Sequence, residues 1–79
     1  MASKQISRTW FMRSGRSAVG IERSNGSFLA YYGLLPVYDP AGTSTVSERF
    51  ATLDDAARFI GWPVGIVDFP PELAALATA

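Results

Sequence analysis

The clearest pattern in the chain is an Asn-Gly pair between two stretches of alternating side chains. Asn25-Gly26 suits a two-residue type I′ turn, because that turn needs a positive φ at both central positions. Counting outward from the turn predicts an antiparallel hairpin of two strands, at about 18–24 and 28–35. The pairs expected on one face are Arg23 with Phe28, Ile21 with Ala30 and Val19 with Tyr32; those on the other face are Glu22 with Leu29, Gly20 with Tyr31 and Ala18 with Gly33.

The second strand of this hairpin is apolar on both faces. Phe28, Ala30, Tyr32 and Leu34 share one face, while Leu29 and Tyr31 share the other with Leu35. Such a strand is typical of a central position in a sheet, of a strand covered on both faces, or of a face left exposed for a partner. Pro36 ends its ladder, because proline donates no backbone hydrogen bond.

Alternating residues also predict a first strand over 4–13, with the even-numbered positions such as Trp10 more buried. We expect Ser14-Gly15 to form the turn into the next strand. A two-residue loop there would place Trp10 opposite Val19, on the same face as Ile21.

A turn-rich connection around Asp39-Pro40 separates the third strand from a fourth, predicted over 43–50. The fourth strand is polar, which favours an edge position.

A helix begins after Thr52, whose hydroxyl is a suitable N-cap, with Asp54 and Asp55 in the first turn. Its apolar stripe is formed by Leu53, Ala56, Ala57 and Ile60. Gly61 is expected to cap its C-terminus and Pro63 to prevent its continuation, which predicts a helix of about nine residues.

The C-terminal part leaves alternatives open. Residues 64–69 form either a fifth strand or an extended segment across the core. Pro70-Pro71-Glu72 can begin a short helix through residue 77, and a frayed terminus is the alternative. The pattern as a whole predicts one α+β domain over residues 1–79: a small antiparallel meander of three to four strands packed against one helix, with a possible short C-terminal helix.

The amino-acid composition excludes several kinds of catalytic and metal-binding site. The chain has no cysteine and no histidine, which excludes disulfides, Cys/His zinc sites, histidine bases and a Ser-His-Asp triad within it. Asp54 and Asp55 are adjacent helical positions that point about 100° apart, and the helix start explains both. No phosphate-binding glycine loop is present. We therefore predict no enzymatic activity, cofactor or metal.

Charge is balanced overall but not along the chain. Residues 1–26 carry five basic residues and one acidic residue, whereas residues 27–79 carry two basic and six acidic ones. The two halves either neutralise each other across the sheet or leave a basic patch for an acidic partner.

The sequence contains no signal-peptide pattern and no run of about 18 apolar residues, so we expect a soluble, cytoplasmic protein without membrane contact.

Arginines interleave with aromatic residues in the N-terminal half, a combination typical of partner surfaces. Trp10 and Tyr32 fit the core, whereas Tyr31 lies off the core face. The residues predicted to contact a partner are Arg8, Arg13, Arg16, Arg23, Leu29, Tyr31 and Leu35.

The whole-chain layout, a meander without Cys or His that combines the Asn25-Gly26 hairpin with one helix near 50–61, resembles small phage and mobile-element proteins. Among these it is similar to some anti-CRISPR inhibitors. That resemblance implies a non-enzymatic inhibitor that binds a larger protein complex, with a CRISPR effector complex as its partner.

Three hypotheses follow for function. The leading one is a non-enzymatic protein-binding module. A second is a small nucleic-acid-binding domain that uses the basic, aromatic hairpin surface. A third is a self-associating structural protein, for instance a homodimer, that pairs through an uncovered sheet face or through residues 64–69.

Overall fold

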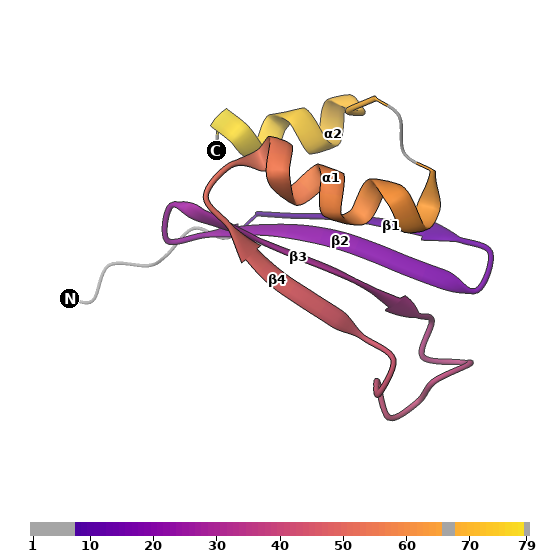
Figure 1. The fold of residues 1–79 in the computed structure, drawn as a ribbon. Helices are drawn as coiled ribbons and strands as arrows, with labels where there is room; N and C mark the ends of the chain where they lie inside the picture. Colours follow the sequence, from indigo (N-terminus) through magenta and orange to yellow (C-terminus); the bar gives the residue numbers. More distant parts are fainter. Residues whose placement is uncertain (1–7, 66–67, 79) are drawn as a thin grey trace.

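The structure is a computed structural model that describes residues 8–65 and 68–78. Four antiparallel strands form one sheet in the order β1-β2-β3-β4, and the helices lie together on one of its faces (Figure 1). The elements are β1 (Arg8–Ser14), β2 (Ser17–Ser24), β3 (Ser27–Leu34), β4 (Val46–Phe50), α1 (Leu53–Val64), α2 (Pro71–Ala74) and the 3₁₀ turn η1 (Ala75–Thr78). The predicted α+β meander with one main helix and a short C-terminal helix is confirmed.

The hairpin at Asn25-Gly26 has the predicted register. Val19 pairs with Tyr32 and Ile21 with Ala30, and the alternate pairs also match. Asn25 has a φ of 56° and Gly26 a φ of 77°, as a type I′ turn requires. β3 lies between β2 and β4, so the strand with two apolar faces is central, which is one of the alternatives that the sequence left open.

The first hairpin turns one residue later than predicted. Its loop is Gly15-Arg16, and Trp10 therefore pairs with Ile21 rather than with Val19. Gly15 has a φ of 58°, which suits the first central position of a type II′ turn. The prediction for the buried face still holds, because the pairing shifts by two positions and side chains alternate with a period of two. Residues 4–7 of the predicted first strand lie outside the described residues.

β4 occupies the predicted edge but begins at Val46 rather than at 43. The preceding residues are turned around the Asp39 carboxylate. It accepts hydrogen bonds from the Thr43 hydroxyl at 3.2 Å, the Ser44 N–H at 2.8 Å and the Ser44 hydroxyl at 2.5 Å. These bonds hold 43–44 in a loop, which shortens the strand.

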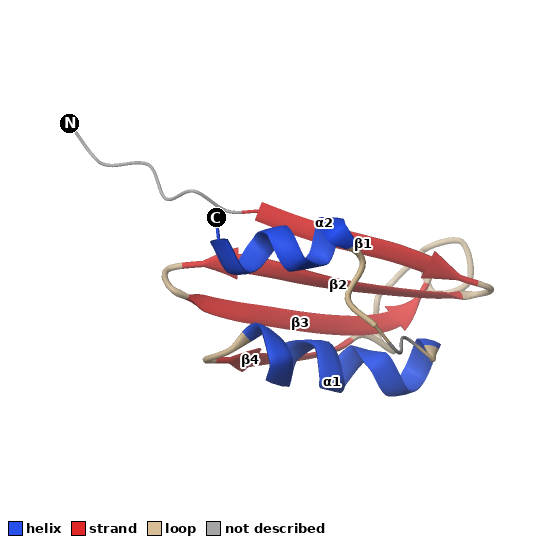
Figure 2. Ribbon diagram, turned by 90° about the horizontal axis from the view of Figure 1, so that it is seen from above, coloured by secondary structure: helices blue, strands red, loops and turns tan. Residues whose placement is uncertain are grey.

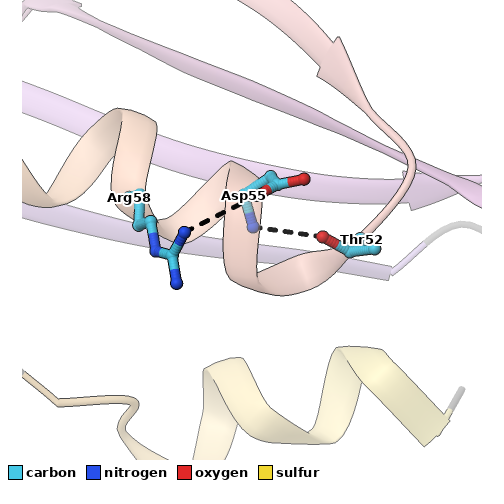
Figure 3. A network of polar contacts seen from close by, with 3 residues as sticks. All are labelled: Thr52, Asp55 and Arg58. Atoms are coloured by element: carbon cyan, nitrogen blue, oxygen red, sulfur yellow. Dashed lines mark hydrogen bonds and ion pairs between the residues drawn. The ribbon is translucent and has the colours of Figure 1, made fainter.

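α1 begins as predicted. The Thr52 hydroxyl accepts the N–H of Asp55 at 3.2 Å, and Arg58 lies 4.0 Å from the Asp55 carboxylate (Figure 3). The capping bond satisfies one of the unpaired donors of the first turn. The ion pair is exposed and contributes little.

The predicted C-terminus of this helix is wrong. α1 continues through Pro63 to Val64, and its cap is Gly65, with a φ of 71° and an N–H that donates to the Gly61 carbonyl. Gly61 is a buried helical residue. A left-handed cap needs a positive φ, which Gly65 rather than Gly61 supplies.

The core lies between the sheet and the helices. It contains Trp10, Val19, Ile21, Phe28, Ala30, Leu53, Ala56, Ala57, Ile60, Leu73 and Leu76. Viewed from above, α1 lies on the β3 and β4 side, and α2 with η1 lies on the β1 and β2 side (Figure 2). Leu73 and Leu76 close the core from the C-terminal helices.

The connection between the helices contains no strand in its described part. Val64 ends α1, and Asp68 and Phe69 have no regular secondary structure. Residues 66–67 of the predicted fifth strand lie outside the described residues. Within the described ranges, no helix is long and apolar enough to cross a membrane.

Candidate interaction surfaces

The sheet face opposite the helices carries the predicted residues Leu29 and Tyr31. Both are half-buried, and the helices of the described chain lie together on the other face of the sheet (Figure 1). A Cβ atom at Gly20 would overlap the ring of Tyr31, so the ring lies across this glycine. Burial, together with the charge of Glu22, raises the pKa of the Tyr31 hydroxyl. Tyr31 thus packs on its own sheet and covers part of the open face.

The predicted arginines are divided between the two ends of the sheet. Arg8 and Arg23 pair across β1 and β2 at one end, and Arg13 and Arg16 flank the first turn at the other. The guanidinium of Arg23 lies 5.7 Å from the Phe28 ring and donates to the Leu76 carbonyl at 3.0 Å. The structure therefore does not bring the four arginines together in one patch.

Arg13 and Arg16 each lie over an exposed aromatic ring. The guanidinium of Arg13 is 5.7 Å from the centre of Phe11, and that of Arg16 is 5.5 Å from the centre of Tyr38. Leu35 lies one residue beyond β3, where its N–H donates to the Arg16 carbonyl at 2.7 Å. Arg16 and Leu35 are thus brought together through the backbone.

A second surface, which we call the Trp62 groove, lies at one end of α1. It is an open groove of about 520 Å³ lined by Ser17, Tyr32, Gly33, Leu34, Ser44 and Trp62. The Trp62 side chain is 86% exposed, and Leu34 is 40% exposed. Val46, which pairs with Tyr32 across β3 and β4, is a further exposed apolar residue.

The wall of the Trp62 groove is held by a short chain of hydrogen bonds. The Ser44 hydroxyl accepts the N–H of Leu34 at 3.3 Å and donates to Asp39. The hydrogen bonds from Ser44 and Thr43 hold the pKa of the Asp39 carboxyl below its usual value. The charged carboxylate therefore fixes one side of the groove.

Aromatic packing holds Tyr32, another lining residue of the groove, in place. The Tyr32 ring lies 5.2 Å from the Phe59 ring, centre to centre, and Phe59 lies 5.3 Å from Phe50. These tilted contacts connect β3, α1 and β4. The groove is therefore formed by packed elements, with apolar and aromatic surface and the hydroxyls of Ser17 and Ser44 along it.

Sequence reasoning missed this groove, although one signal was present. Trp62 follows Ile60 by two positions and therefore lies off the apolar stripe that faces the sheet. A large aromatic residue at such a position marks an exposed apolar side chain.

Among residues 8–65 and 68–78, no three acidic, histidine or cysteine side chains gather where they would hold a metal ion. Comparison of the chain with protein-family models, with curated proteins and with solved structures gives no match.

Proposed function

We propose that this chain is a non-enzymatic protein-binding module that receives an apolar side chain of its partner in the Trp62 groove. The observation that carries the proposal is the exposure of Trp62, 86%, in the lining of an open groove of about 520 Å³. Tryptophan is enriched among the residues that dominate binding energy at protein interfaces. Folding of this chain alone gains little from a side chain left so exposed.

The surroundings of the groove favour a protein partner. Leu34 and Val46 extend the apolar surface beyond Trp62, and Ser17 and Ser44 place hydroxyls beside it. An apolar centre with a polar rim is the usual arrangement of a protein interface. The layout resembles anti-CRISPR inhibitors, so a CRISPR effector complex, blocked by binding, is the first partner to examine.

The test is capture of a stoichiometric partner by the tagged chain, from purified CRISPR effector complexes and from extracts of the native host. Trp62→Ala should abolish capture. Phe11→Ala is the matched control, because Phe11 is an exposed aromatic residue of the opposite sheet face. Capture that depends on Phe11 and not on Trp62 would assign binding to the open sheet face and overturn the groove as the site.

A nucleic-acid-binding function is the second candidate, favoured by Arg13 and Arg16. Both lie over aromatic rings near the first turn, where they would neutralise phosphates beside surfaces on which bases stack. This function requires retention of single-stranded nucleic acid at low salt, with affinity that falls steeply as salt rises. Arg13→Glu combined with Arg16→Glu should abolish that retention, and unchanged retention would exclude these arginines as the site.

A further inference from the structure

The outer edge of β1 has unpaired backbone groups. β1 is one of the two edge strands, and no other strand of the described chain lies beside its outer edge. Ser14 and Ser17 close a two-residue hairpin loop, so the even-numbered residues of β1 exchange hydrogen bonds with β2. The N–H and C=O groups of Thr9, Phe11 and Arg13 therefore point outward.

β1 also lacks most of the features that protect edge strands from pairing. It contains no proline, and its centre, Trp10 to Met12, is apolar. β4, the other edge, has only five residues, with Glu48 and Arg49 among them. The seven-residue β1 is therefore the edge better suited to add another strand.

The helices leave this edge accessible. A groove of about 510 Å³ runs beside β1, lined by Thr9, Trp10, Phe11, Met12, Pro70 and Glu72. Pro70 and Glu72 belong to the start of α2, which borders the strand without filling the space next to it.

We propose that β1 pairs with β1 of a second copy of this chain, antiparallel and around a two-fold axis at Phe11. In this register Phe11 faces Phe11 of the second copy, and Trp10 faces Met12. The outward backbone groups of Phe11 then pair with their own equivalents, and those of Thr9 pair with those of Arg13. The two sheets join into one continuous sheet with all helices on the same face.

Charge favours this register and this occupant. Arg8 lies opposite Ser14 and Arg13 opposite Thr9, so no arginine faces an arginine across the two-fold axis. Glu72 lines the groove that the second copy would enter. In the proposed register Arg8 of the second copy is the diagonal cross-strand neighbour of Met12 in the first copy, on the helix side of the sheet. From there its long side chain approaches the Glu72 carboxylate of the first copy.

The dimer is independent of the proposed partner site. No residue that lines the Trp62 groove belongs to β1, so the Trp62 groove of each copy stays free in the dimer. A failure of the pairing would leave the Trp62 proposal intact, and the reverse also holds.

Cysteine cross-linking tests the register, because the chain contains no cysteine of its own. In the proposed pair the Cα atoms of the two residues 11 lie about 5.5 Å apart, within the range that a disulfide bridges. Phe11→Cys should therefore form a disulfide-linked dimer under mild oxidation. Arg13→Cys is the matched control, because its two copies lie about 14 Å apart and should not cross-link. The double variant Thr9→Cys with Arg13→Cys keeps Phe11 and should cross-link, although neither single change does.

Molar mass by light scattering tests the pairing itself. The unmodified chain should shift from monomer to dimer as its concentration rises, and Phe11→Lys should remain a monomer because it places two like charges face to face. Ser47→Pro on β4 should leave the dimer unchanged, since Ser47 also points its N–H outward but at the other edge. A monomer mass at every concentration, or equal cross-linking of Phe11→Cys and Arg13→Cys, would overturn the proposal.

Discussion

Ile60 and Trp62 are two positions apart in α1. Replacing the smaller residue, Ile60, with alanine should lower the free energy of unfolding far more than replacing the larger Trp62. Ile60 is fully buried, and replacing a buried isoleucine with alanine costs about 2–5 kcal/mol through lost burial and the cavity left behind. Trp62 is 86% exposed, so Trp62→Ala should change the free energy of unfolding by less than about 0.5 kcal/mol.

Urea denaturation followed by tryptophan fluorescence measures both effects. Trp10 is buried in the core and reports unfolding in each variant, and in Trp62→Ala it is the only remaining tryptophan. With a denaturant slope of about 1 kcal/mol/M, Ile60→Ala should lower the midpoint by roughly 2 M or more. The midpoint of Trp62→Ala should stay close to that of the unmodified chain.

The reasoning is refuted if Trp62→Ala loses as much stability as Ile60→Ala. That result would mean that Trp62 is packed in the folded chain, and the Trp62 groove would lose its exposed anchor.

Three further outcomes follow from the capping and turn contacts. Thr52→Ala should cost about 1 kcal/mol in thermal or urea unfolding while Thr52→Ser restores it, because the hydroxyl accepts the Asp55 N–H; equal loss in both would exclude this bond. Gly65→Ala should cost about 1–2 kcal/mol, since its φ of 71° is unfavourable for a residue with a Cβ. Folding lowers the pKa of the Asp39 carboxyl, so the hydrogen bonds from Ser44 to the charged carboxylate stabilise the fold fully above the pKa of the unfolded state, near 3.8. This stabilisation is lost as the pH falls through the lower pKa of the folded state. Asp39→Asn should therefore be less stable than the unmodified chain at neutral pH and approach it in acid; a constant difference across that pH range in urea titrations would contradict this.

The sheet was predictable where local rules and the hydrophobic pattern agree. Asn25-Gly26 allowed only one register that kept Val19 and Ile21 on the core face, and the structure has that register. At the first turn the hydrophobic pattern does not distinguish the two possible loops, because Ser14-Gly15 and Gly15-Arg16 both keep Trp10 on the same face of the sheet. Turn chemistry separates them: a type I′ turn at Ser14-Gly15 needs a positive φ at serine, whereas the type II′ turn needs it only at Gly15.

The end of α1 was misplaced because two glycines follow its apolar stripe. Gly61 and Pro63 together suggested an early stop, but a proline in the last turn interrupts little of the helix that remains. Gly65 has the positive φ of a cap, and the helix gains a turn that carries Trp62.

The Trp62 groove depends on long-range packing. Its lining comes from β2, β3, the turn before β4 and α1, and their approach is set by how the helix crosses the sheet. No spacing within the sequence encodes that approach. The uncovered face with Leu29 and Tyr31 was predictable, because it follows directly from strand register.

The most direct test of the proposed function is the affinity of a captured partner for the unmodified chain, Trp62→Ala and Phe11→Ala, measured by calorimetry. A central interface tryptophan contributes about 2 kcal/mol or more, so Trp62→Ala should weaken binding by roughly 30-fold or more. Phe11→Ala should bind as the unmodified chain does. Equal affinities for the unmodified chain and Trp62→Ala would contradict the account.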